Sequence, residues 1–295
     1  MFISKDHVIY TMDKKNPPAA YCPSGAEVTF ETCDCFHDSV QSEKDLISGI
    51  DFNHINPATG PLYIEGALPG HALKVDILAI DLQEQGATVA APGLGRLADR
   101  IQKEETVIGH LQDGYLEFKG LSLPLRKMIG VIGTAPAGEG IATGTPHDHG
   151  GNMDCTMITE GVSLYLPVNV EGALLSLGDL HATMADGEVM GAGLEIAGQV
   201  RIRVEIIEDF PYGLPFVETE DRYITIASRP TMEEASDLAI HHMADLVMHK
   251  TGFSLEQAGM LVSLAADLKV CQIVDPNKTM RVEFKKGSLG IRSWA

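Results

Sequence analysis

The sequence motifs of several common enzyme classes are absent from this chain. Its 295 residues contain no GxGxxG, no GxxxxGK[ST], no HExxH and no GxSxG pattern. Rossmann-type dinucleotide binding, P-loop nucleotide hydrolysis, zincin proteolysis and α/β-hydrolase chemistry each depend on one of these patterns. The sequence therefore disfavours all four classes.

Basic and aromatic residues are also scarce. Lys and Arg number 22 against 41 acidic residues, for a net charge of −19, and aromatic residues make up 6%. A strongly negative chain is repelled by nucleic acid and by anionic membranes, so we expect neither as a partner. No apolar run approaches the roughly 18 residues that a membrane span requires. The first ten residues also contain no long apolar segment typical of a secretory signal.

The few cysteines do not form a recognisable framework. There are five, an odd number at uneven spacings: Cys22, Cys33, Cys35, Cys155 and Cys271. Secreted disulfide-rich domains carry even numbers at regular spacings. We therefore expect no disulfide scaffold and a location in the reducing cytoplasm.

The residues that are present predict a mainly β fold. Thirty glycines and fifteen prolines favour a turn-rich chain, and Val200, Ile202 and Val204 alternate with polar residues as in a half-buried strand. The Gly- and Ala-rich segment 85–103 is expected to be a loop with one helical turn that covers a site.

Helices are predicted only near the C-terminus. Thr231 with Glu234 and Ser254 with Gln257 form capping boxes. The predicted elements there are a helix to about 250, a helix to about 268, and strands at 271–274 and 280–284. We thus predict a β-rich domain over residues 1–229 and a C-terminal α+β portion over residues 230–295.

One segment, from Thr143 to Glu195, carries most of the candidate chemistry. It contains no Lys or Arg, yet it holds many carboxylates and imidazoles: His147, Asp148, His149, Asp154, Asp179, His181, Asp186, Glu188 and Glu195. A bound divalent cation would itself supply the positive charge that this segment lacks. The composition therefore points to a metal site, although surface strands also carry such residues without a metal.

The spacing of these residues adds to the metal hypothesis. Asp179 and His181 are two residues apart, as are Asp186 and Glu188. In a strand, residues two apart lie on the same face. Mixed nitrogen and oxygen ligation suits Zn²⁺, Fe²⁺ or Mn²⁺, whereas an all-carboxylate subset suits Ca²⁺.

A catalytic zinc lowers the pKa of a bound water toward ~7, and a nearby carboxylate can then accept its proton. Glu188 and Glu65 are the candidates for that carboxylate. The Asn152 amide is a candidate donor to a carbonyl oxygen. Cys155 as a thiol nucleophile is the alternative, and a buried apolar filler is the simpler interpretation of that cysteine.

The block GGNMDCTMITEGVSLYLPVNVEGALLSLGDLHATMADGE resembles the signature block of the acetamidase/formamidase family. The resemblance extends to Thr32-Cys33-Asp34, to residues 56–67 and to Glu195. It implies hydrolysis of formamide or acetamide to a carboxylate and ammonia. It also implies a β fold with jelly-roll-like and barrel-like parts, association with zinc and calcium, and a dimer or larger homo-oligomer.

Carried over by position, the resemblance implies the site residues Asp34, Asn56, Glu65, Asn152, Asp154, Asp179, His181, Asp186, Glu188 and Glu195. From these and His147 we predict the metal ligands Asp179, His181, Glu195, Asp34, Asp154 and His147. The predicted catalytic residues are Glu188, Asn152 and Glu65.

Two positions depart from the family. Many members have Gln-Gly where this chain has Met184-Ala185, and His149 stands where others can carry an aromatic residue. If the Gln contacts the amide, Met184 alters substrate preference. Two alternatives to a metal-dependent amidase stay open. The protein could bind a metal or small ligand without turnover, or it could be an amidase that uses Cys155 or Cys35 as its nucleophile.

Overall fold

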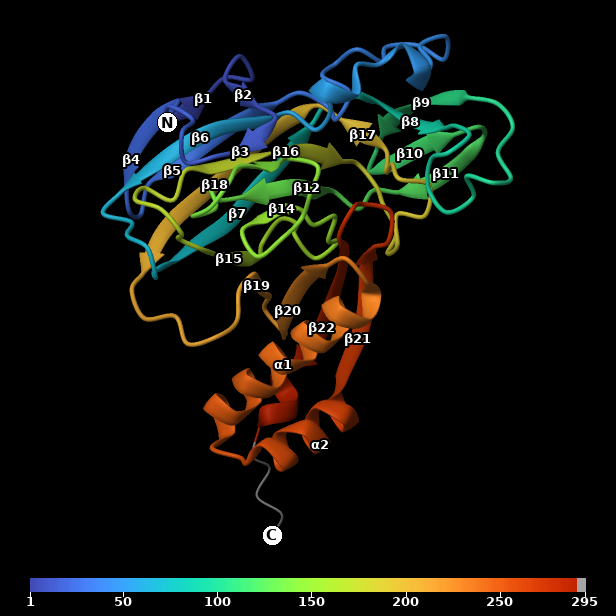
Figure 1. The fold of residues 1–295 in the computed structure, drawn as a ribbon. Coiled ribbons are helices and arrows are strands. Elements are labelled where there is room, and N and C mark those ends of the chain that lie inside the picture. The colour runs from blue at the N-terminus through green and yellow to red at the C-terminus, as the bar shows by residue number, and fades with distance from the viewer. Residues whose placement is uncertain (291–295) are drawn as a thin grey trace.

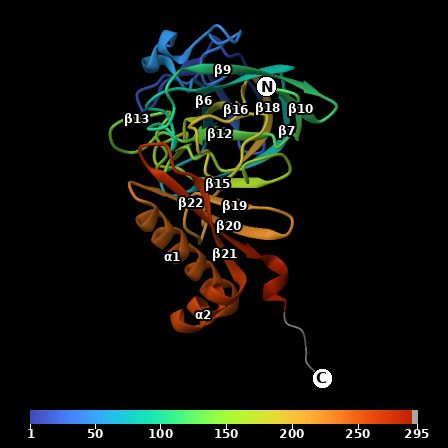
Figure 2. The same ribbon diagram turned by 90° about the vertical axis from the view of Figure 1, so that its right-hand side faces the viewer.

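A β-rich body and a smaller α+β lobe make up the protein, as a computed structural model shows for residues 1–290 (Figure 1). The strands form a nine-stranded sheet, an eleven-stranded sheet and a two-stranded sheet. Both α-helices lie in the C-terminal lobe, where they cover one face of its strands (Figure 2). This arrangement confirms the prediction of a mainly β fold with helices near the C-terminus.

The nine-stranded sheet runs through both parts of the molecule. In order across the sheet its strands are β1 (Phe2–Ile3), β5 (Glu27–Thr32), β18 (Gly198–Ile207), β7 (Ala72–Leu82), β15 (Ser163–Pro167), β19 (Phe216–Glu218), β20 (Arg222–Arg229), β22 (Lys278–Lys285) and β21 (Ala266–Gln272). β18 pairs with β5 on one side and β7 on the other. Its residues alternate between buried and exposed, as the sequence pattern predicts.

The eleven-stranded sheet holds the segment rich in acids and histidines. In order across the sheet its main path contains β11 (Leu121–Pro124), β10 (Tyr115–Phe118), β9 (Glu105–Gln112), β8 (Gln85–Ala90), β17 (Glu195–Ile196), β16 (Leu175–His181), β12 (Met128–Gly133) and β14 (Gly150–Asn152). β6 (Ala58–Glu65) also pairs with β16, and with β2 (Val8–Ile9) and β4 (Ala20–Pro23). The small sheet joins β3 (Thr11–Met12) to β13 (Ile141–Ala142).

The expected loop over residues 85–103 is wrong in its first part. Residues 85–90 form β8, which pairs with β9 along its whole length. Ala87 and Val89 alternate into a buried apolar cluster, so packing favours a strand despite the Gly and Ala content.

The main hydrophobic core joins the two large sheets. Phe30, Ile77 and Val200 of the first sheet belong to the same buried cluster as Ile129 and Leu177 of the second. In residues 1–290 no helix combines the length and apolar character that crossing a membrane demands.

Local sequence signals set most helix ends in the C-terminal lobe. α1 (Met232–Thr251) has the predicted capping box of Thr231 and Glu234 and ends at Gly252, whose φ is +73°. α2 (Leu255–Ala265) has the box of Ser254 and Gln257. It ends three residues before the predicted 268, because β21 begins at Ala266 and pairs there with Phe284 of β22.

The division of the chain near residue 229 stays a prediction. β20 ends at Arg229, and β22 follows the two helices in the sequence. The two strands are paired along their whole length, from Arg222 opposite Lys285 to Arg229 opposite Lys278.

A buried ion-pair network ties the lobe to the β body. The Glu283 carboxylate, 3% exposed, accepts hydrogen bonds from Arg281 Nε at 2.8 Å, from Lys269 Nζ at 3.0 Å and from Arg222. Arg281 also donates to Asp186 of the β body at 2.6 and 3.0 Å. Burial opposes ionisation of Glu283, but the bonds from Arg281 and Lys269 outweigh it and hold the pKa of Glu283 below its ordinary value.

We expect Glu283→Gln to lower the free energy of unfolding by ~3 kcal/mol at pH 7, because it leaves buried cations without their carboxylate. Because the pKa of Glu283 is lower in the folded state than in the unfolded state, its carboxylate stabilises the fold fully at pH values above the unfolded-state pKa of about 4.3. That stabilisation disappears as pH falls through the folded-state pKa, so the wild type and the variant should converge in acid. Urea unfolding between pH 7 and pH 3 tests this. Glu27→Gln, at an exposed pair with Arg203, is the control and should change little. A difference that stays constant with pH would contradict the prediction.

Candidate metal centre and active site

Strand pairing brings His181 and Glu195 together. His181 is the last residue of β16 and lies directly opposite Glu195, the first residue of β17. His181 Nε2 is 3.0 Å from Glu195 Oε2 and 3.5 Å from Asp179 Oδ1. The structure therefore brings Asp179, His181 and Glu195 together, and their role as metal ligands stays a prediction.

Two further carboxylates converge from other segments. Asp154 follows β14, and its Oδ1 lies 3.8 Å from His181 Nε2. Ligand atoms of Asp154, His181 and Glu188 lie within 4.8 Å of one another, as do those of Cys35, Asp179 and Glu195. All of these residues are buried. Two adjoining groups of three donors thus form one centre.

The backbone around this centre adopts uncommon conformations. Asp154, Asp179 and Glu188 have φ values of +41°, +55° and +44°. Non-glycine residues rarely adopt the left-handed region, and they cluster at functional sites when they do. Three such residues in one cluster indicate that the fold holds these side chains in place against local preference.

A glycine beneath the carboxylates lets them approach β12. A Cβ on Gly130 would lie 2.5 Å from Asp154 Oδ1 and 2.6 Å from Asp179 Oδ2. The two carboxylates therefore occupy the space that any other residue at position 130 would need.

The donor set fits a divalent metal ion. Within residues 1–290, the buried oxygens Asp154 Oδ1 and Oδ2, Asp179 Oδ1, Glu188 Oε2 and Glu195 Oε2 have no hydrogen-bond partner. Buried polar atoms in native proteins are nearly always paired, and unpaired ones call for a water or an ion. Carboxylates with one imidazole and a thiol are ligands that zinc accepts, and calcium would use the oxygens alone.

The electrostatics also indicate a missing positive charge. Burial raises the pKa of Glu195 to about 7, with Asp179 adding to the rise and His181 opposing it. Burial likewise raises the pKa values of Asp154 and Glu188 well above the ordinary range. For His181, burial disfavours the imidazolium, yet Glu195 and Asp179 raise its pKa well above normal. One imidazolium cannot neutralise four carboxylates, whereas a divalent cation added to it nearly can.

A cavity of about 580 Å³ opens onto this centre. Its acidic lining comes from Asp179, Glu188, Glu195 and Asp275, and Asn152 lies beside them. Apolar and aromatic side chains also line it, among them Tyr10, Phe52, Ile55, Leu94 and Val274, and so does Asn56, which the family resemblance implied. The lining contains no Lys or Arg, so the cavity favours neutral or cationic ligands over anions.

Asp275 is a site residue that the sequence analysis missed. It lies at the tip of the β21–β22 hairpin, and its Oδ2 accepts a hydrogen bond from Asn152 Nδ2 at 3.0 Å. Gln272 shapes this tip by accepting the N–H groups of Val274 and Asp275 at 2.9 and 3.0 Å. Asn277 Nδ2 fixes the tip to the body by donating to Pro146 O at 2.8 Å. The C-terminal lobe therefore supplies part of the cavity wall.

Three of the predicted metal ligands and catalytic residues lie outside the centre. Asp34 Oδ1 accepts the N–H groups of Phe36 and Asp38 at 2.9 and 2.7 Å, and the next residue, Cys35, faces the centre instead. The side chain of His147 is 44% exposed. Glu65 is exposed at the end of β6, whereas Ala58, at the start of that strand, pairs with Gly178. The strand carries Glu65 away from the site.

The cavity geometry weighs against a cysteine nucleophile. Cys155 is fully buried in the main core and does not line the cavity. Cys35 does line it, but burial together with Glu195, Asp179 and Asp34 raises the pKa of its thiol well above normal. A nucleophilic thiol needs a lowered pKa and a basic neighbour, and Cys35 has acidic neighbours.

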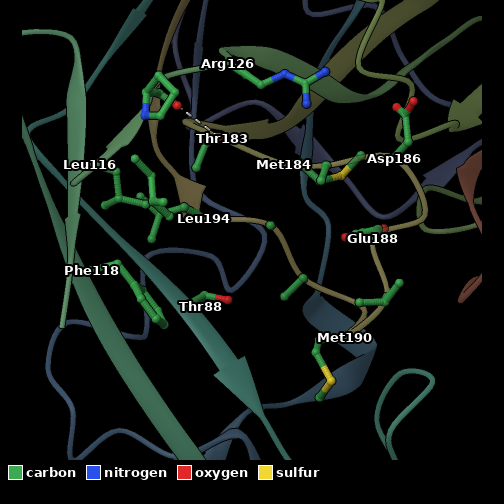
Figure 3. A pocket seen from close by; sticks show the side chains of 16 residues that line it. Thr88, Leu116, Phe118, Arg126, Thr183, Met184, Asp186, Glu188, Met190 and Leu194 are labelled. Atoms are coloured by element: carbon green, nitrogen blue, oxygen red, sulfur yellow. Dashed lines mark hydrogen bonds between the residues drawn. The ribbon is translucent and has the colours of Figure 1, made fainter. Parts of the chain in front are cut away.

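A second cavity of about 460 Å³ is lined largely by the segment 183–194 (Figure 3). Met184 lines it together with Leu116, Phe118 and Leu194, and Glu188 borders both cavities. Met184 does not line the cavity with the acids. Its side chain borders the apolar cavity instead, and an effect of Met184 on substrate preference stays a prediction.

Comparison with known proteins gives one consistent family. The model of the Acetamidase/Formamidase family matches residues 13–143 and 137–284. The acetamidase structure from Bacillus halodurans superposes with a TM-score of 0.96 at 46% identity, covering 99% of this chain and 100% of that one. The predicted acetamidase/formamidase from Thermoanaerobacter tengcongensis gives a TM-score of 0.94 at 43% identity, covering 99% and 98% of the two chains.

A similar curated protein is the formamidase of Methylophilus methylotrophus, 27% identical over 231 residues. That match covers 59% of this chain and 56% of the formamidase. In this formamidase and in two further curated relatives, the match with this chain covers less than two thirds of the relative's own length.

Proposed function

This chain belongs to the acetamidase/formamidase family, and from that premise we propose that it hydrolyses short aliphatic amides to a carboxylate and ammonia. The observation that carries the proposal is the buried cluster of Asp154, Asp179, His181, Glu188 and Glu195, with its unpartnered oxygens. Three of the five, Asp179, Glu188 and Glu195, line one cavity. The cytoplasmic location stays a prediction.

We infer that Asp154, Asp179, His181 and Glu195 hold a divalent metal ion, most simply zinc, with Glu188 beside them. When bound, such an ion supplies Lewis acidity, which polarises a carbonyl oxygen and lowers the pKa of water. Calcium is the alternative ion and would use the carboxylates alone. Cys35 is the one soft donor beside them, and with His181 it favours zinc over calcium.

Glu188 is suited to carry a proton between water and the leaving amine. It borders the cavity, and its Oε2 has no partner within the described residues. Burial raises the pKa of this carboxyl well above normal, which favours its protonated form and suits it to give a proton to the leaving amine. Ammonia leaves readily only after its nitrogen is protonated, and Glu188 Oε2 is the atom that we assign to this delivery.

Asn152 can contact a substrate amide through either end of its side chain. One N–H of its Nδ2 donates to Asp275, and the second N–H can still donate to a carbonyl oxygen, as predicted. Its Oδ1 is buried without a partner within residues 1–290. We therefore assign Asn152 Oδ1 the task of accepting an N–H of the substrate amide, which orients the C–N bond in the cavity.

We expect the purified protein to release ammonia from formamide or acetamide and to contain a stoichiometric divalent metal by mass spectrometry. Removal of the metal by a chelator should reduce kcat/KM at least ~100-fold, because Lewis acidity is worth several kcal/mol. Added Zn²⁺ should restore the rate, and added Ca²⁺ should not.

Two outcomes would contradict this proposal in different ways. Full activity in a metal-free sample would remove the metal role and leave the amidase assignment standing. No ammonia from a panel of short amides, cyclic amides and ureas, with metal present, would favour the alternative of a binding protein without turnover.

A further inference from the structure

The tip of the β21–β22 hairpin, residues 271–277, lies against the β body (Figure 1). One residue of the body, Gly187, forms a parallel bridge with the outer edge of β21. The Gly187 N–H donates to Cys271 O at 2.7 Å, and the Ile273 N–H donates to Gly187 O at 3.3 Å. The hairpin tip is therefore bonded to the residue directly before Glu188.

The backbone at Glu188 needs support from outside its own segment. Its φ of +44° lies in the left-handed region. In a residue other than glycine this conformation is costly, and it persists only where the surrounding structure enforces it. Both strands of the hairpin contribute here, because β21 bonds to Gly187 while Arg281 of β22 donates to Asp186 at 2.6 and 3.0 Å. The hairpin thus fixes the turn that carries the Glu188 carboxyl.

The same tip also holds Asn152. Asp275 Oδ2 accepts one N–H of Asn152 Nδ2 at 3.0 Å. Because the side-chain amide is planar, a bond to its nitrogen fixes the direction in which its oxygen points. Both residues line the cavity, and Asp275 belongs to neither group of converging ligand atoms. Asp275 therefore has the contacts of a residue that orients Asn152, and not those of a metal ligand.

One buried side chain, that of Gln272, shapes the tip. It is 0% exposed. Its Oε1 accepts the N–H groups of Val274 and Asp275 at 2.9 and 3.0 Å, and its Nε2 donates to Asn277 O at 2.6 Å. Its own backbone forms the bridge to Gly187. A single residue thus couples the contact with the β body to the turn that carries Asp275.

We propose that the hairpin tip positions the two residues assigned to the substrate, Glu188 and Asn152. Asp275 acts through the Asn152 amide, and Gln272 acts through the backbone of Gly187. One hairpin thus keeps both groups in their relative places, which makes the C-terminal lobe a working part of the active site. The expected effect on rate rests on the proposed function, whereas the expected effect on the backbone does not.

Substitutions at Asp275 separate positioning from direct chemistry. Asp275→Ala removes the acceptor and should lower kcat/KM for acetamide or formamide at least ~10-fold, with metal content and circular dichroism unchanged. Asp275→Asn keeps an oxygen that can accept the Asn152 N–H, so kcat/KM should stay within about threefold of the wild type. A metal ligand or a general base would not survive that change. Asp221→Ala, in the turn between β19 and β20, is the matched control and should leave rate and metal unchanged.

A double-mutant cycle tests whether Asp275 acts through Asn152. Asn152→Ala alone should lower kcat/KM at least as much as Asp275→Ala does, because the amide itself is then lost. Adding Asp275→Ala to it should lower kcat/KM by less than about twofold more, since the group that Asp275 orients is already absent. Effects that multiply would mean that the two residues act independently, and the assigned role of Asp275 would be wrong.

Amide hydrogen exchange tests the hold on Gly187 without any substrate. Asn277 Nδ2 anchors the tip by donating to Pro146 O at 2.8 Å, and Asn277 does not line the cavity. Asn277→Ala should therefore loosen the tip, as should Gln272→Met, which keeps the side-chain volume and removes its hydrogen bonds. In both variants, exchange of the peptides that contain Gly187 and Ile273 should become at least about threefold faster, and in the control variant it should not change.

The outcomes separate this inference from the proposed function. Unchanged exchange at Gly187 in both tip variants, loss of metal in Asp275→Ala, or an inactive Asp275→Asn would overturn the inference. A wild type that releases no ammonia from any short amide would contradict the proposed function instead. Exchange at Gly187 would then still decide whether the tip holds this segment.

Discussion

If the proposed function holds, replacing Gly130 with alanine is expected to reduce kcat/KM for acetamide or formamide at least ~100-fold and to remove most of the metal that we propose the centre holds, while the fold persists. One added methyl group would lie 2.5 Å from Asp154 Oδ1 and 2.6 Å from Asp179 Oδ2. Both contacts are shorter than atoms tolerate, so both carboxylates must move. A displacement of about 1 Å at a catalytic centre can cost roughly 10²-fold in rate.

The conformation of residue 130 should accept the change, although a Cβ there would also lie 2.9 Å from the backbone oxygen of Asp179, so that β16 must shift slightly. Gly130 lies in the buried strand β12, and its φ is not in the left-handed region that glycine alone prefers. Overpacking by one methyl group costs about 1–3 kcal/mol, less than the usual stability of a domain. A folded protein without its metal is therefore the expected product, rather than an unfolded one.

Metal content by mass spectrometry, ammonia release and thermal unfolding, measured on the same sample, separate these effects. Gly138→Ala is the matched control, since a Cβ at Gly138 meets nothing within 4 Å. Gly138→Ala should keep both metal and activity. If Gly130→Ala kept both as well, the two carboxylates would not be needed where the structure places them.

Much of the centre could be predicted from local sequence. Asp179 and His181 are two residues apart in a segment that reads as a strand, and β16 places both on one face. The absence of Lys and Arg between Thr143 and Val200 predicted a region of unbalanced negative charge. The structure shows that region as buried carboxylates with raised pKa values.

The other parts of the candidate site depend on contacts between segments far apart in the chain, which no local sequence pattern encodes. Asp275 lies in an ordinary Asp-Pro-Asn turn, and only the docking of the hairpin tip through Asn277 and Asn152 makes it a site residue. Asp34 and Cys35 are neighbours, so a single turn of the backbone decides which of them faces the centre. That turn follows from hydrogen bonds to Asp34 within the 34–38 loop, which the residue types alone leave open. The start of β21 at Ala266 likewise reflects pairing with β22, which overrides a helical pattern.

Replacing His181 with asparagine should have the largest effect of all. His181 Nε2 lies within 4 Å of Asp154, Asp179 and Glu195, so it is the shared neighbour of the carboxylates and the one imidazole among them. Asparagine keeps a polar group but cannot carry the positive charge or place a ring nitrogen at that position. We expect kcat/KM to fall at least ~10³-fold, which corresponds to about 4 kcal/mol of lost transition-state stabilisation.

His149 provides the control for that experiment, because it is another buried histidine of the same segment. It is 2% exposed, and neither of its ring nitrogens has a partner within the described residues. It belongs to neither group of converging ligand atoms. His149→Phe keeps the ring shape and should retain metal and activity within a few-fold, whereas His181→Asn should lose both. If both variants kept their metal and their activity, the buried imidazoles of this segment would only fill space. His181 would then not be a metal ligand, which would contradict the prediction.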